Sequence, residues 1–282
     1  MLLDVINMQR SVFDLLNNKI DYEKEYDKLK KFMFENACVL RKLGFYYEET
    51  YESIFDELIM DWEYRGTFTS LGDMWKALEA ELMWMNITEG LLYVCELILN
   101  IHEYFIYRED IPPFEPAVLN DKMYIENIHI LLSSLGYKSH KEGNYRICLL
   151  KTDADSINTA QVVKSKELSE LILNYNDFKI VNSVEDKKSI LFELSQYLEP
   201  DRSKLKGINK SLDADISTAL NNLHIRHNNL NGDNKKEYTS TLEEKEFINW
   251  YDKTYYLILL AFRLLELPDI QKEFTNLRTS LK

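Results

Sequence analysis

Apolar side chains recur at three- and four-residue steps along most of this 282-residue chain, and few residues interrupt the pattern. That spacing places apolar side chains on one face of an α-helix, so each run predicts an amphipathic helix. With only 8 glycines and 5 prolines, the chain offers few positions at which a helix must end. We therefore expect an all-α protein, a helical bundle held together by these apolar faces.

The periodic runs predict helices over residues 21–43, 48–64, 73–109, 119–135, 153–178, 185–198, 212–230 and 242–267. Gly90 is the position at which the third helix can kink, and Pro268 is expected to break the last one. A short strand, or a hairpin that contains it, is expected at residues 145–150, where the sequence YRICLL follows Gly143.

The clearest linker is IPPFEP at residues 111–116, because its three prolines each remove a backbone donor and favour extended backbone. We place a domain boundary there. The expected domains are an N-terminal helical domain over residues 1–116 and a C-terminal helical domain over residues 117–282, packed together as one protein.

Charge and cysteine content restrict the environment. The net charge of −13 argues against nucleic acid binding over the whole surface, so any such site must be a local patch. Cys38, Cys95 and Cys148 are far apart in the sequence and lack metal-binding spacing, which suits a reducing compartment. No apolar run is long enough to span a bilayer. We expect a cytoplasmic protein without a membrane partner.

The stretch from Lys210 to Asn234 joins a well-marked helix to a polar cluster. Its apolar stripe predicts a helix that reaches Leu230, with Gly232 as its stop. On a helical wheel, Arg226 and His227 flank this stripe, so both would lie at the edge of a helix–helix interface. An arginine there needs a carboxylate, a backbone carbonyl or a phosphate as its partner.

The segment Ile225–Gly232, IRHNNLNG, resembles the signature of the HEPN superfamily (higher eukaryotes and prokaryotes nucleotide-binding domains). That signature is an arginine, a polar residue, three variable positions and a histidine. Arg226 and His227 match the first two positions, and Asn231 stands where the family has histidine. The resemblance implies a C-terminal HEPN-like four-helix bundle and, as in active members of the superfamily, a homodimer and metal-independent cleavage of RNA. The proteins that this chain resembles are uncharacterised bacterial members. DNA is not an expected ligand.

The resemblance also assigns roles to individual residues. It places Arg226, His227 and Asn231 at the catalytic positions, and it makes Arg226, His224, Asn228, Lys235 and Lys236 the expected RNA-binding residues. An amide is neither an acid nor a base near neutral pH, so Asn231 predicts a site that binds RNA but cleaves it weakly unless His227 or His224 substitutes. Residues 201–239 carry two more basic than acidic side chains, which supports an anion site.

Two other interpretations remain open. In the first, Arg226 and His227 are structural, capping backbone or pairing with an acidic residue such as Asp252, and the chain is a scaffold or protein-interaction protein without catalysis. In the second, Glu126 and His129 form half of a di-iron site, although the sequence has no second Glu-x-x-His pair. No P-loop, dinucleotide fingerprint, nucleophile elbow or zinc signature is present, so we expect no metal or cofactor.

Overall fold

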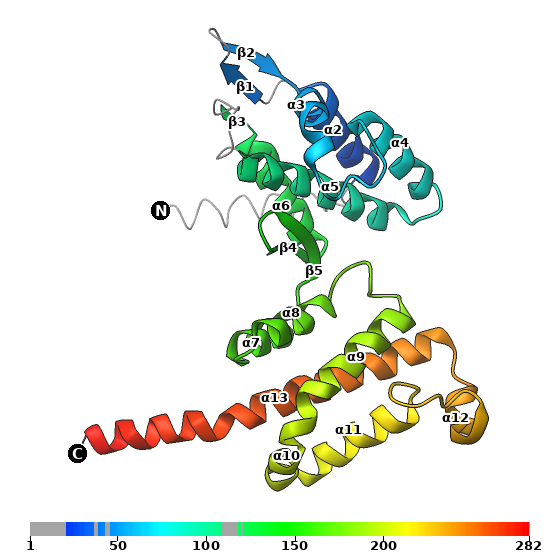
Figure 1. Ribbon diagram of the computed structural model, residues 1–282, viewed down its shortest axis with the longest axis vertical. Coiled ribbons are helices and arrows are strands. Elements are labelled where there is room, and N and C mark those ends of the chain that lie inside the picture. The colour runs from blue at the N-terminus through cyan, green and yellow to red at the C-terminus, as the bar shows by residue number, and fades with distance from the viewer. Residues whose placement is uncertain (1–20, 37–38, 43–45, 109–117, 120, 282) are drawn as a thin grey trace. The chain divides into compact units, whose positions relative to one another are not determined.

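The computed structural model describes residues 21–281 apart from 37–38, 43–45, 109–117 and 120. The described chain is predominantly helical (Figure 1), which confirms the all-α prediction. It forms two compact units, an N-terminal unit of residues 1–135 with 139–148 and a C-terminal unit of residues 136–138 with 149–282. The expected linker at residues 111–116 lies outside the described residues, and the division between the units passes through a hairpin further along the chain.

The N-terminal unit contains most of the short elements. Its helices are α2 (Tyr22–Phe34), α3 (Tyr51–Leu58) with the 3-10 turn η1 (Ile59–Asp61), α4 (Leu71–Leu82), α5 (Ile87–Arg108) and α6 (Lys122–Ser134). Its small sheet has the order β2-β1-β3, from β1 (Val39–Lys42), β2 (Tyr46–Glu49) and β3 (Val118–Leu119). Val39 lies opposite both Glu49 and Leu119 in antiparallel register.

Three predicted helices of this unit are too long. The helix expected over 48–64 is α3 followed by η1, which together cover residues 51–61, and residues 48–49 belong to β2. The helix expected over 21–43 ends at Phe34, and the chain then forms β1. Pairing with β2 gives the backbone N–H and C=O groups of β1 the hydrogen bonds that a longer helix would have given them. The helix expected over 73–109 is two helices, since Asn86 caps a new start: its Oδ1 accepts from the amide of Glu89 at 2.9 Å. Gly90 lies inside α5, and a Cβ there would be 3.0 Å from the Leu82 side chain.

The hairpin that links the units confirms the expected strand. It consists of β4 (Tyr137–Glu142) and β5 (Arg146–Lys151), so the predicted strand at 145–150 is β5. The sequence pattern did not identify β4, whose side chains are polar and mostly half-buried. Gly143 between the strands has a φ of 62°, a conformation that glycine adopts without steric cost.

The C-terminal unit is a helical bundle. Its elements are α7 (Ala154–Val162), α8 (Lys166–Asn174), α9 (Val184–Leu198), η2 (Glu199–Asp201), α10 (Arg202–Ile208), α11 (Lys210–Asn222), η3 (Gly232–Asn234), α12 (Glu237–Ser240) and α13 (Glu244–Ser280). Helix α13 packs against α7, α9, α10 and α11, and α8 packs against both α7 and α9 (Figure 1). The core is apolar, with Leu191, Leu194, Ile216, Leu220 and Ile258 fully buried.

Two further boundaries differ from prediction. The helix expected over 153–178 is interrupted, because the Ser165 hydroxyl accepts from the amide of Leu168 at 3.2 Å and starts α8. Pro268 does not break the last helix but lies inside α13, which continues to Ser280. A proline removes one helical hydrogen bond, and the turns on both sides continue without it.

Candidate functional site

The polar cluster lies on a loop and not on a helix, which corrects the predicted helix over 212–230. Helix α11 ends at Asn222, and His224 has a φ of 62°, outside the right-handed helical region. Leu223 and Ile225 are nevertheless buried in the core of the unit. The start of the loop therefore packs on the same core, while Leu230, the last residue of the predicted stripe, is 38% exposed. Because the chain is not helical here, the wheel positions of Arg226 and His227 do not apply.

Asn229 fixes the shape of this loop. Its side chain is buried, its Oδ1 accepts from the His224 amide at 2.8 Å, and its Nδ2 donates to the Asn234 carbonyl at 3.1 Å. Its carbonyl accepts from the amide of Lys236 at 2.9 Å. One amide side chain therefore holds both ends of the loop, and the backbone carrying Arg226 has a defined path.

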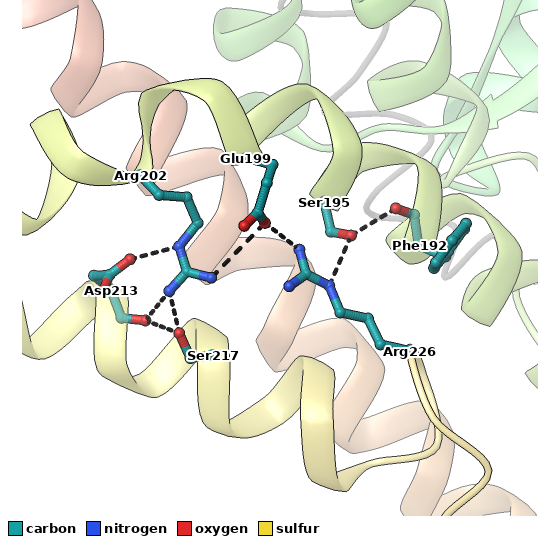
Figure 2. A network of polar contacts seen from close by, with 7 residues as sticks. All are labelled: Phe192, Ser195, Glu199, Arg202, Asp213, Ser217 and Arg226. Atoms are coloured by element: carbon teal, nitrogen blue, oxygen red, sulfur yellow. Dashed lines mark hydrogen bonds and ion pairs between the residues drawn. The ribbon is translucent and has the colours of Figure 1, made fainter.

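Arg226 is half-buried and bonded within the chain. Its Nη2 lies 2.7 Å from Oε2 of Glu199, and its Nε donates to the hydroxyl of Ser195 at 3.3 Å (Figure 2). The Ser195 hydroxyl donates in turn to the carbonyl of Phe192 at 2.7 Å. The acidic partner of Arg226 is thus Glu199 at the end of α9, whereas Asp252 pairs with another residue.

A second arginine reaches the same carboxylate. Nε of Arg202 is 2.7 Å from Oδ1 of Asp213, and its Nη2 donates to the hydroxyl of Ser217. Its Nη1 lies 3.9 Å from Oε2 of Glu199, the oxygen that Arg226 also contacts (Figure 2). The Glu199 side chain is 54% exposed, compared with 12% for Asp213. Two guanidinium groups therefore converge on one carboxylate that faces solvent.

The other predicted residues are on the solvent side of the loop. His227, Asn228 and Asn231 are exposed, and Nδ2 of Asn228 donates to Oδ1 of Asn231 at 2.6 Å. Lys235 and Lys236 are exposed as well. The structure thus places Arg226 with Glu199 and Arg202, and it leaves His227, Asn228, Asn231, Lys235 and Lys236 exposed on the same stretch of chain.

The His224 side chain has a shifted pKa. Burial lowers its pKa below the usual value because it disfavours the charged imidazolium form, and the nearby Lys188 ammonium group lowers it further by repelling a positive charge on the ring. The Lys188 Nζ lies 3.0 Å from Nε2 of the ring. This arrangement favours a neutral imidazole at the start of the loop.

We expect the stability of wild type to rise with pH more steeply than that of His224→Asn. The unfolded chain holds the His224 proton up to its ordinary pKa near 6.5, while the folded chain releases it at lower pH, so stability increases as pH rises from the folded pKa to about 6.5. Asparagine tolerates positive φ and does not titrate. Urea unfolding midpoints at pH 5.5 and 7.5 would measure the effect. An equal change in midpoint between the two pH values for wild type and His224→Asn would contradict it.

Glu199, Arg202 and Ser195 were not among the site residues predicted from the sequence. One signal for Arg202 was present: Asp213 lies three and seven residues before Ile216 and Leu220, on the buried face of α11, and a buried carboxylate requires a cation. No local pattern could have identified Glu199, because it is separated from Arg226 by helices α10 and α11 and part of a loop.

The Glu126–His129 pair has ordinary contacts. Glu126 lies 3.8 Å from the Lys122 ammonium group, and Nδ1 of His129 lies 3.5 Å from the Ser139 hydroxyl. Within the described ranges, no three His, Cys, Asp or Glu side chains are placed to hold a metal ion. None of the described helices is both long and apolar enough to cross a membrane.

No family model, curated protein or solved structure matches this chain. The HEPN resemblance therefore depends on the quoted residues alone. The function has to be inferred from the chemistry of the Arg226 site itself.

Proposed function

We propose that the C-terminal unit binds RNA, with Arg226 as the principal contact to a backbone phosphate. The observation that carries this proposal is the position of Glu199, an exposed carboxylate between two guanidinium groups. A phosphate presents the same kind of anionic oxygen and pairs with arginine in the same geometry. An RNA phosphate that displaces Glu199 would form an ion pair with Arg226. The exposed Lys235 and Lys236 would add positive charge on the same loop.

Cleavage is the more demanding half of this proposal. His227 directly follows Arg226 and is exposed, so its imidazole is accessible and is the proton-transfer group of this proposal. Asn231 has no such capacity, and Asn228 already donates a hydrogen bond to it. We therefore propose an RNA-binding protein of HEPN type in bacterial defence or stress, in which any cleavage depends on His227 and not on Asn231.

Substitutions at Arg226 and Glu199 should change RNA affinity in opposite directions. Arg226→Ala removes the phosphate partner and should weaken binding about tenfold, as expected for one charge-assisted contact of about 1.4 kcal/mol. Glu199→Gln removes the competing negative charge while keeping the side-chain shape, so it should strengthen binding. Fluorescence anisotropy with a single-stranded RNA at several salt concentrations would measure both, and Arg226→Ala should reduce the salt dependence.

Arg146→Ala is a matched control, since Arg146 also forms an exposed ion pair, at 3.4 Å with Glu142, but belongs to the β4–β5 hairpin. It should leave RNA affinity unchanged. Equal affinity of wild type and Arg226→Ala would refute RNA binding at this site. Cleavage assays of His227→Ala and Asn231→Ala in the same series would show whether His227 is required.

A second candidate function is supported by the N-terminal unit. Met83 and Trp84, in the turn between α4 and α5, are 81% and 87% exposed, and apolar side chains of this size on a surface are typical of protein interaction sites. On this alternative the chain is a scaffold without catalysis, and the Arg226–Glu199 pair is purely structural. It predicts no RNA affinity above background at physiological salt, in either wild type or Glu199→Gln.

A further inference from the structure

The last part of α13 extends beyond the bundle. Helix α13 runs to Ser280 (Figure 1). Every residue from 267 to 281 is exposed. Lys164, before α8, contacts Glu266 and Asp269 at 3.7 and 3.1 Å, so α13 still touches the unit there. The packed part of α13 supplies the helix nucleus, but each residue added without packing gains little free energy in water, because most helix stability in proteins comes from packing of an apolar face. A partner that covers this segment would therefore stabilise it.

The exposed apolar residues of this segment follow a heptad repeat. They are separated by steps of three, four, three and four residues, and they are Leu267, Ile270, Phe274, Leu277 and Leu281. We call these five residues the α13 seam. In heptad terms they alternate between the a and d positions, the arrangement of a left-handed coiled coil.

The same register continues toward the bundle. Tyr256 and Leu260 are exposed at the preceding d and a positions, with Arg263 at the d position between Leu260 and Leu267. Arg263 pairs with Asp155 at 3.2 Å, which marks where the helix is flanked by α7. Pro268 falls at a b position, on the outer side of the helix, where its missing hydrogen bond does not interrupt the seam.

We propose that the α13 seam pairs with the α13 seam of a second copy of this chain in a parallel coiled coil. The charges beside the seam support both the partner and its direction. Glu273 is at a g position and Arg278 is at the following e position, five residues later. In a parallel dimer Glu273 faces Arg278 of the partner subunit, and symmetry forms this pair twice. An antiparallel pairing would instead place the glutamates at g, Glu266 and Glu273, against each other.

This dimer surface is independent of the proposed RNA site. The Tyr251 hydroxyl donates to the carbonyl of Leu223, where the Arg226 loop begins, and Tyr251 precedes Leu267 by about 24 Å along the helix axis. Substitutions in the seam leave the Arg226 contacts in place. Loss of the dimer and loss of RNA binding can therefore be measured separately.

Light scattering after gel filtration tests the pairing. Wild type is expected at twice the 33.5 kDa chain mass, and Leu277→Glu, which places a charge in the seam, is expected at 33.5 kDa. Thr275→Glu adds the same charge at an exposed b position and should remain dimeric. Circular dichroism would verify that each variant is folded. A monomeric wild type at 100 µM, or a Leu277→Glu protein that stays dimeric, would overturn the proposal.

The parallel direction has its own test. Glu273→Arg and Arg278→Glu should each raise the dimer dissociation constant, because each places like charges across the seam. The double variant restores the pair in reversed order and should return to the wild-type constant. Sedimentation equilibrium would measure all four proteins. Additive losses in the double variant would rule out the parallel arrangement.

Discussion

Arg202→Ala should lower the free energy of unfolding of the C-terminal unit by about 3 kcal/mol, the low end of the range for a buried pair that loses one partner. The carboxylate of Asp213 is mostly buried and would keep no cation. Its place in the first turn of α11 offsets part of this cost, because the helix dipole favours negative charge there. Chemical unfolding followed by circular dichroism would measure the loss, and hydrogen exchange of α11 amides would assign it to this unit.

Arg226→Ala is the matched comparison, and we expect it to cost less than about 1 kcal/mol, because the Glu199 it leaves is 54% exposed and can be solvated. The double variant Arg202→Ala/Asp213→Ala should be more stable than Arg202→Ala alone, since no buried carboxylate is then unpaired. Equal losses for Arg202→Ala and Arg226→Ala would contradict the distinction between the two arginines. A large loss of stability in Arg226→Ala would also mean that reduced RNA binding by this variant could result from unfolding.

Asp252→Ala should destabilise the same unit by about 3 kcal/mol, because it leaves a buried ammonium group without a carboxylate. The Lys187 side chain is only 5% exposed, its Nζ contacts Oδ1 of Asp252, and it lies 4.4 Å from the centroid of the Tyr175 ring. The Tyr175 hydroxyl donates to the same carboxylate oxygen at 3.0 Å, and the ring stacks on Tyr255. Removing Asp252 therefore affects α8, α9 and α13 together.

The pH dependence of this variant is specific to its cause. An unpaired buried lysine has a lowered folded pKa, so the folded state gains stability relative to the unfolded state as pH rises above that value. The deficit of Asp252→Ala should therefore shrink between pH 7 and pH 10 in urea unfolding experiments. Adding Lys187→Met should restore stability at neutral pH. A deficit that is independent of pH would show that lost packing, and not the stranded charge, is the cause.

Helix positions were predictable where apolar spacing and a capping residue coincide. The expected helix over 185–198 matches α9, whose start is fixed by the Ser183 hydroxyl accepting from the amide of Asp186. The helix breaks at Asn86 and Ser165 were missed, although both residues are good N-caps, because the apolar pattern continued across them. Periodicity reports which side chains face the core and does not report whether the backbone between them is continuous.

The candidate site shows the same limit more strongly. The sequence identified Arg226 as an arginine that needs an anionic or carbonyl partner, and the structure gives it Glu199 and Ser195. It also identified the loop residues His227, Asn228 and Asn231, but placed them on a helix. Of the predicted apolar stripe, Leu223 is buried after α11 has ended, because the start of the loop packs on the core, whereas Leu230 is 38% exposed.

The chain alone therefore determined the helical class, most helix positions and the residues whose charge demands a partner, since these depend on local spacing and on the cost of burying a charge. Only the tertiary structure decided which partners those residues have and where the backbone leaves the helix. The reason is that pairs such as Arg226 with Glu199 and Lys187 with Asp252 join elements far apart in sequence, and their geometry is set by packing of the whole bundle.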